Sequence, residues 1–371
     1  MNRQDIPKTM AAHGLVNGRG PSEMGGIEPK VRSFGNILPI HNNKKNMLYP
    51  IIFEPIFRQM VWGGEKIPAY KGVKADVDHI GESWEISAYG DKVSVVANGP
   101  LAGRDLNSLV KEFKGELVGK HIYADNGDEF PLLIKFIDAL NDLSIQVHPN
   151  DSMAERVHGP GNKGKTEMWY VISADPGAAL YCGLKQAITP DDYTRMVADG
   201  SITDALQRYE VHPGDVFFLP PGRIHSICSG CFLAEIQETS DLTYRIWDYG
   251  RLGLDGKPRQ LHTELAREAI DYKVYPEGYK TSYKHAQDRE VVLVNCPFFT
   301  TSLYDLTRPL KKSLKGIDSF MVVMVLEGNG TLECMGHTQE LRQGTTILIP
   351  ANATSILFTP CNTLKLLTSH I

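Results

Sequence analysis

The chain has 371 residues, with 39 basic and 44 acidic side chains and a formal net charge of −5. This balance argues against bulk electrostatic binding of nucleic acid, which needs a surplus of Lys and Arg. No apolar run approaches the ~18 residues of a membrane-spanning helix, so we expect neither a nucleic-acid nor a membrane partner. The apolar fraction of 42% supports a large core, in a chain long enough for two domains or one domain with a large insertion.

Residues 1–46 differ in composition from the rest of the chain. They hold six glycines and no sustained apolar periodicity. They also lack the apolar stretch of about 7–15 residues that a secretory signal requires. We therefore expect a disordered leader over residues 1–46, with Met47 as a plausible physiological start.

The six cysteines are scattered along the chain. Cys228 and Cys231 enclose Ser-Gly, a spacing compatible with a redox or zinc pair, but no second pair accompanies them. Ser-Gly is also typical of a hairpin turn, so we favour reduced, buried thiols in a cytoplasmic protein.

From Tyr49 onward the chain is rich in β-forming residues between Gly, Asn and Pro. Helical spacing interrupts this pattern at 105–114, and Thr189 followed by Pro190 is a strong helix start. A second short helix is expected over 201–209. The expected strands lie at 83–87, 93–96, 132–137, 143–147 and 216–219.

Three separated clusters carry side chains that can bind one metal ion. They are Gln146-Val147-His148, Lys165-Thr166-Glu167 and Pro220-Pro221-Gly222-Arg223-Ile224-His225. Residues 146 and 148 are two apart, so on a strand their side chains point to the same face. Imidazole, carboxylate and amide oxygen suit a borderline cation such as zinc.

A spacing found near residue 220 returns near the C-terminus. The first copy is Gly214, Pro220, Gly222 and His225, and the second is Gly344, Pro350, Asn352 and Ser355. A strand over 320–326 with a hairpin turn over 327–330 is expected just before the second copy. The second copy keeps the scaffold without the ligands, so we predict that it binds no metal.

The first of these spacings resembles a motif of the cupins, which are small double-sheet β-barrels. Three longer motifs resemble type I mannose-6-phosphate isomerase, in its short bacterial branch: Leu143–Asp151, Gly164–Tyr170 and Thr243–Arg251. This resemblance extends over about 48–371. It implies an all-β dominated fold with two cupin-like β-barrel or jelly-roll domains and a small helical insertion.

The resemblance also implies domain boundaries. A catalytic cupin domain would span 47–285, with helical segments near 105–120 and 189–209. A degenerate cupin domain without metal ligands would follow over 286–371.

In that family the zinc ligands would fall on Gln146, His148, Glu167 and His225, with one Zn²⁺ per chain. The active-site arginine would be Arg245, and Lys165 and Lys135 would bind substrate. Larger members carry a histidine where this chain has Gly164. The proton-transfer or ring-opening role of that histidine is therefore assigned to no residue of this chain.

The reaction that this family implies moves a proton between C1 and C2 of a phosphorylated sugar, through a cis-enediol. The intermediate needs positive charge, for which Arg245 is a reasonable donor, and the phosphate needs fixed cations. A base must also reach C1 or C2. Glu235 is the first candidate base and Asp248 the second.

Several alternatives remain open at this stage. Gln146 can orient a ligand instead of binding metal, Lys135 can cap a strand, and Arg245 can pair with Asp241 or Asp248. His148, Glu167 and His225 also satisfy the two-histidine, one-carboxylate triad of non-haem iron oxygenases. A non-catalytic cupin that senses phosphosugars is a further alternative. The oligomeric state is also open, with a monomer and a homodimer both compatible with the sequence.

Overall fold

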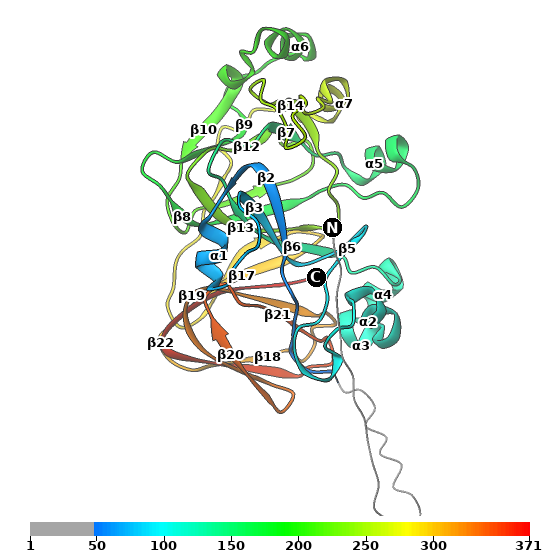
Figure 1. The fold of residues 1–371 in the computed structure, drawn as a ribbon, viewed down its shortest axis with the longest axis vertical. Coiled ribbons are helices and arrows are strands. Elements are labelled where there is room, and N and C mark those ends of the chain that lie inside the picture. Colours follow the sequence, from blue (N-terminus) through cyan, green and yellow to red (C-terminus); the bar gives the residue numbers. More distant parts are fainter. Residues whose placement is uncertain (1–47) are drawn as a thin grey trace, which may run out of the picture. The chain divides into compact units, whose positions relative to one another are not determined.

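The central sheet of the structure has seven strands and carries part of the candidate site. The structure, a computed structural model, describes residues 48–371 (Figure 1). The predicted leader lies outside them, as does residue 47. The order of the central sheet is β15 (Lys280–Thr281), β11 (Val216–Leu219), β8 (Glu167–Ala174), β13 (Cys231–Glu238), β6 (Leu132–Asp138), β3 (Ile80–Ile86) and β2 (Ile56–Gly64).

A five-stranded sheet packs against one face of the central sheet. Its order is β10 (Leu206–Glu210), β9 (Ala179–Leu184), β12 (His225–Ile227), β7 (Ile145–Val147) and β14 (Tyr244–Trp247). Apolar side chains of both sheets form one core, for example Leu180 of β9 against Trp169 of β8.

An eight-stranded sheet packs against the opposite face. Its path is β1 (Ile51–Ile52), β21 (Thr346–Ile349), β19 (Met321–Cys334), β22 (Ser355–His370), β17 (Thr300–Leu306) and β16 (Glu290–Asn295), with β18 (Leu310–Ser313) beside β22 and β20 (His337–Arg342) beside β19. Figure 1 shows β19 to β22 in orange and red at the lower end, with β7, β9 and β12 in green toward the upper end. A separate pair joins β4 (Ala88–Tyr89) to β5 (Lys92–Val93).

The alternation of side chains along β8 explains why the central sheet is covered on both faces. Trp169 and Val171 belong to the core shared with the five-stranded sheet. Met168 and Tyr170 belong to the core shared with the eight-stranded sheet. Glu167 has the parity of Trp169, so it faces the five-stranded sheet.

The helices are short and lie at the edges of the sheets. They are α1 (Lys66–Lys71), α2 (Leu106–Phe113), α3 (Gly115–Val118), α4 (Lys120–Asn126), α5 (Asp151–His158), α6 (Pro190–Asp199) and α7 (Thr263–Ala269), with 3-10 turns at Gly99–Leu101 and Ile202–Ala205. The predicted start of α6 is confirmed, because Thr189 and Asp192 form a reciprocal capping box. Among residues 48–371, none of the helices combines the length and the apolar character needed to cross a bilayer.

The spacing that occurs near residue 220 and again near residue 350 corresponds to two equivalent strand–turn–strand units. In the first copy β11 ends at Leu219 and β12 begins at His225. In the second, β21 ends at Ile349 and β22 begins at Ser355. Ser355 therefore has the place in its unit that His225 has in the first.

Two local predictions were wrong. The segment 206–209 is not helical, because it pairs with β9 as strand β10 after a single 3-10 turn. No hairpin turn lies at 327–330, because β19 continues through these residues beside β22. A Cβ on Gly328 would come 2.1 Å from Thr363 O, so this glycine permits a close approach of two strands.

The mainly β character predicted from the sequence is confirmed, with antiparallel sheets stacked on one another. In the described part of the chain the sheet orders are those of open layers, as in a jelly roll, and no closed barrel forms. Strand β1 pairs with β21, so the first strand of the proposed catalytic domain lies in the C-terminal sheet. Tyr70 Oη also donates to Leu326 O at 2.6 Å, which ties α1 to β19.

Candidate metal centre and active site

The connection between β7 and β8 folds back on itself, so that the side chains of His148 and Glu167 lie close together. Lys165 N donates to Pro149 O at 3.1 Å, and Gly164 N donates to the Asp151 carboxylate at 2.7 Å. A Cβ on Gly164 would lie 2.7 Å from the backbone of this same turn. Only glycine fits there, so the absence of a side chain at Gly164 lets the two ligand segments pack directly together.

His225 reaches the same place through the turn that precedes β12. Gly222 N donates to His148 O at 2.9 Å, which joins the turn to the segment that carries His148. Gly222 has a φ of +83°, and a Cβ there would stand 2.8 Å from Ala269 O. In the ladder between β12 and β7, His225 is the register partner of Gln146.

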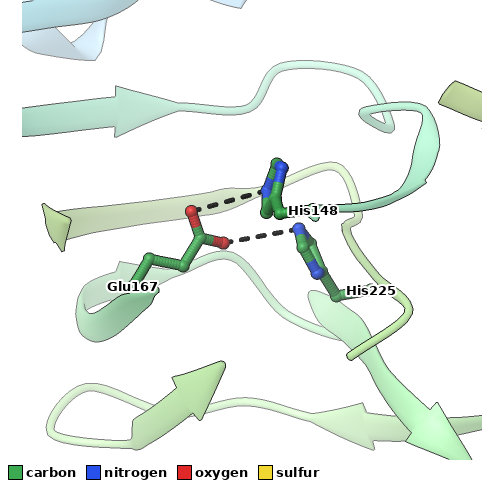
Figure 2. Close-up of side chains that lie close together, drawn as sticks. All are labelled: His148, Glu167 and His225. Carbon is green, nitrogen blue, oxygen red and sulfur yellow. Dashed lines mark ion pairs between the residues drawn. The ribbon is translucent and has the colours of Figure 1, made fainter. Parts of the chain in front are cut away.

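Figure 2 shows the Glu167 carboxylate facing both imidazole rings. Glu167 Oε2 lies 3.6 Å from His148 Nε2, and Oε1 lies 3.4 Å from His225 Nε2. Four donors about 2.0–2.1 Å from one tetrahedral ion stand about 3.3–3.4 Å apart. The spacing of these three side chains therefore fits a single metal ion of the size of zinc.

Both histidines present the same nitrogen to this point. The Nδ1 of His148 lies 2.8 Å from Leu242 O, and the Nδ1 of His225 lies 2.8 Å from Arg223 O. A carbonyl only accepts, so Nδ1 carries the proton and Nε2 keeps its lone pair. Burial lowers the pKa of His225 to about 3 and lowers that of His148 well below its usual value, so both rings are neutral.

Glu167 is fully buried, and its Oε1 accepts no hydrogen bond within the described part of the chain. Burial raises the pKa of this carboxyl, while Lys165, whose Nζ lies 2.7 Å from Oε2, acts against the rise. A buried carboxylate oxygen without a hydrogen-bond donor is costly unless a cation binds it. His148, Glu167 and His225 thus fit a metal ion in chemistry as well as in spacing.

Gln146 lies beside this cluster, with its Nε2 3.2 Å from His225 Nε2. A half-turn of the side-chain amide exchanges its oxygen and its nitrogen. Gln146 therefore has the reach of a fourth ligand through Oε1 or of a neighbour that orients His225.

The cluster lies beside a cavity of about 210 Å³ between the central and five-stranded sheets, lined in part by Gln146. Its volume is below the ~300–1,000 Å³ of pockets for drug-sized ligands, which suits a small polar molecule. The ionisable side chains of its lining are Lys135, Lys165, Arg245, Arg259, Glu82, Glu235 and Asp241.

Comparison with known proteins identifies the family of this chain. Family models described as "Phosphomannose isomerase type I, catalytic domain" and "Mannose-6-phosphate isomerase, cupin domain" match residues 52–170 and 289–371. The chain is 34% identical to mannose-6-phosphate isomerase ManA of Bacillus subtilis over 303 residues, 81% of this chain and 93% of ManA. It is 33% identical to mannose-6-phosphate isomerase of Streptococcus mutans over 325 residues, 87% of this chain and 99% of the relative. The chain belongs to the type I mannose-6-phosphate isomerase family.

The fold agrees with this family. A crystal structure of the mannose 6-phosphate isomerase from Bacillus subtilis superposes with a TM-score of 0.78 and 32% identity, and covers 87% of this chain and 99% of that structure. The cupin-like fold that the sequence resemblance implied is therefore confirmed.

Within this mannose-6-phosphate isomerase family member, two buried lysines and two glutamates connect the metal cluster to the cavity. Lys135 Nζ lies 3.1 Å from Glu235 Oε1 and 3.9 Å from Glu82. Lys165 Nζ lies 2.7 Å from Glu167 and 4.0 Å from Glu235. Burial acts against the charge of Lys135, but the two carboxylates raise its pKa above the usual value. Lys135 is thus part of the charge network and no simple strand cap.

Glu235, predicted as the base, is held as an anion by this network. Trp169 Nε1 donates to its Oε2 at 2.8 Å. Burial alone would raise the pKa of Glu235, but the charges of Lys135 and Lys165 lower it below its usual value. Both oxygens of Glu235 have partners, Trp169 Nε1 at Oε2 and Lys135 Nζ at Oε1. This geometry fits positioning of the lysines better than proton transfer.

Arg245 projects from β14 beside Gln146, its register partner in β7. Its Nε donates to Ser144 Oγ at 3.3 Å and its Nη1 to Gln260 O at 2.8 Å. The backbone of Arg245 is fixed by His262, whose Nδ1 accepts from Arg245 N at 3.2 Å. The guanidinium forms no ion pair within residues 48–371, so the alternative of a structural pair with Asp241 or Asp248 is not supported.

Asp248, the second candidate base, lies outside the lining of the cavity. Arg251 Nη2 donates to its Oδ1 at 2.6 Å, and Arg259 Nη1 donates to the same oxygen at 3.2 Å. The Asp248 carboxylate therefore holds the side chains of Arg251 and Arg259 in place.

Sequence reasoning missed Glu82, Arg259 and Glu238. Glu238, at the end of β13, accepts a hydrogen bond from Thr166 N at 2.8 Å and so holds the segment that carries Lys165 and Glu167. No local motif marks these three residues, since each gains its partner from a distant part of the chain.

Glu238→Gln is expected to remove a pH-dependent loss of stability. Burial raises the pKa of Glu238 to about 7 from an unfolded value of 4.5. The folded state therefore loses stability as pH rises from about 4.5 through 7, by on the order of 3 kcal/mol at about 1.4 kcal/mol per pKa unit. Glutamine keeps the acceptor for Thr166 N without this cost, so the free energy of unfolding of the variant should fall less over that range.

Urea denaturation at pH 4.5, 6 and 8 measures this difference. Glu155→Gln, at an exposed position on α5, is the matched control and should follow the wild-type pH profile. An identical pH profile for Glu238→Gln and the wild type would show that Glu238 does not titrate in this range.

Proposed function

We propose that this protein is a zinc-dependent isomerase that interconverts mannose 6-phosphate and fructose 6-phosphate through a cis-enediol intermediate. The observation that carries this proposal is the cluster of His148, Glu167 and His225 beside a small cavity lined by four cationic side chains. Membership of the family and the names of the two relatives support the same reaction.

The proposed metal ligands are His148, Glu167 and His225, with Gln146 as the fourth. Two neutral imidazoles and one carboxylate leave a divalent ion with a net positive charge. When bound there, zinc would supply Lewis-acid polarisation of substrate oxygens. The donor set and the spacing both favour zinc over a hard cation that needs six or more oxygens.

The chain's own residues would then complete the site. We propose that Arg245 donates hydrogen bonds to the oxygens that become anionic in the enediolate. Lys135 and Lys165 would bind substrate oxygens, held in place by Glu235. Because the site is buried between two sheets, these charges act in a medium of low dielectric constant, where they are most effective.

Gln146→Ala is expected to weaken metal binding about 10- to 100-fold without abolishing it, as for loss of one neutral ligand or of its supporting contact. Competition for zinc against a chromogenic chelator measures the affinity. Gln207→Ala, at a position whose side chain donates to the adjacent carbonyl, is the matched control. An unchanged zinc affinity for Gln146→Ala would exclude Gln146 from the metal site.

The experiment that tests the proposed function is a coupled assay for fructose 6-phosphate with mannose 6-phosphate as substrate, on protein of measured metal content. Isomerisation by the zinc-loaded protein is the expected result. Zinc-loaded protein without product would indicate a phosphosugar-sensing cupin. Bound iron with oxygen consumption coupled to turnover would indicate an oxygenase.

We further propose a cytoplasmic location and a small phosphorylated sugar as the substrate. The location is supported by the cysteines, all of which are free thiols.

A further inference from the structure

Two arginines of one segment, Arg251 and Arg259, pair with the carboxylate of Asp248 beside the cavity. Arg251 donates through Nε and Nη2 to Asp248 and through Nη1 to Asp142 O, so each of its three nitrogens has a partner. Arg259 reaches the same Asp248 only through Nη1, at 3.2 and 3.5 Å from the two oxygens. Within residues 48–371 the Nε and Nη2 of Arg259 have no hydrogen-bond partner.

The charges of the cavity are balanced unevenly. The lysines Lys135 and Lys165 each have a carboxylate within 3.1 Å. Arg245 and Arg259 both line the cavity, but only the weak contact of Arg259 to Asp248 joins either of them to a carboxylate. Burial and then the charge of Arg245 lower the pKa of Arg259 to about 10. Glu82 and Asp241 also line the cavity, but within residues 48–371 neither forms an ion pair with Arg245 or Arg259. The two guanidinium groups therefore keep hydrogen-bond donors that an anion can accept from.

The order of residues across the five-stranded sheet places Arg245 and Arg259 progressively farther from His225. Gln146 is the register partner of His225 on one side and of Arg245 on the other. Arg245 Nη1 in turn donates to the carbonyl of Gln260, the residue after Arg259. His225, Gln146, Arg245 and Arg259 thus follow one another away from the metal donors.

The proposed substrate has the matching arrangement. Its reacting carbons are C1 and C2, and its phosphate is on C6, at the opposite end of the molecule. A sugar whose reacting oxygens face the metal donors and Arg245 would bring its phosphate toward Arg259. A guanidinium with two free donors binds a phosphate through parallel hydrogen bonds.

We propose that Arg259 binds the phosphate of the substrate and determines the preference for phosphorylated sugars, with Asp248 and Arg251 as positioning residues. This proposal rests on the proposed function, and it assigns to Arg259 a role distinct from that of Arg245. The loop that carries Arg251 and Arg259 is then the specificity element of the site.

Arg259→Ala is expected to raise KM for mannose 6-phosphate about 10- to 100-fold, the loss of a charge-assisted contact, with kcat little changed. Arg259→Lys should recover part of the loss, because it keeps the charge without the two-pronged geometry. Arg195→Ala, at an exposed position on α6, is the matched control and should leave both constants unchanged.

Calorimetry with inorganic phosphate on the zinc-loaded proteins gives a second readout that needs no turnover. Arg259→Ala should weaken phosphate binding in parallel with KM, while metal content and thermal unfolding stay as in the wild type. Unchanged phosphate affinity, or a fall in kcat at constant KM, would overturn the proposal. If the wild type made no fructose 6-phosphate, the proposed function would fail, and the phosphate titration would still decide the role of Arg259.

Discussion

Replacing His225 with alanine is expected to lower zinc content to background and to reduce isomerisation by about 1,000-fold or more, since Lewis-acid stabilisation contributes several kcal/mol. His225 is 1% exposed, and its Nε2 faces Glu167 and Gln146. Its removal takes one of the two imidazoles from the cluster. Zinc content per chain and the coupled assay measure the two effects on the same sample.

His212→Ala is the matched control, because His212 is exposed in the turn before β11. It should keep full zinc content and activity. Since His225 is buried, circular dichroism must show that the variant is folded. A folded His225→Ala protein with a full complement of zinc would remove His225 from the ligand set.

Arg245→Ala is expected to keep its zinc and to lose about 100- to 1,000-fold in kcat, the usual cost of removing one donor to a developing oxyanion. Arg245 pairs with Gln146 in the β-ladder, but within residues 48–371 its side chain makes no hydrogen bond to a proposed metal ligand and donates to Ser144 and Gln260. The metal site should therefore survive the change. Steady-state kinetics together with metal analysis separate turnover from metal binding.

Arg259→Ala serves as the comparison for this variant, since both residues are arginines of the same cavity. We expect a loss in kcat for Arg245→Ala and a rise in KM for Arg259→Ala. Full activity of Arg245→Ala would show that our assignment of this residue is wrong.

The parts of the fold that the sequence predicted best are those with strong local signals. The strand 216–219 has the predicted bounds, because four apolar residues stand between two Pro-Gly turns. The start of α6 was also predicted correctly, because its capping residues act within one turn of the helix. The likeness of the two strand–turn–strand units was visible because their turns share the same spacing.

The errors came where distant strands override a local pattern. Gly328 and Gly330 are typical of a hairpin turn, yet both lie where β22 passes too close for a side chain. Residues 206–209 lack strand alternation, and the ladder with β9 decides their conformation. Such contacts depend on the three-dimensional arrangement of sheets, which local periodicity does not encode.

The candidate site also contains residues that the sequence predicted and residues that it did not. His148, Glu167 and His225 stood out because ligand types at strand and turn positions are rare together. The charge state of Glu235 could not be predicted, because it depends on Lys135 and Lys165 from two other strands. Arg259 lies in a polar loop without a motif, and only the cavity reveals it.

The most direct test of the account is to remove the metal and restore it. Protein treated with chelator and dialysed should lose isomerase activity toward mannose 6-phosphate, and activity should rise linearly with added Zn²⁺ to a plateau at one equivalent per chain. Full activity of the metal-free protein, or no activity at any zinc loading, would contradict a zinc-dependent isomerase built on His148, Glu167 and His225.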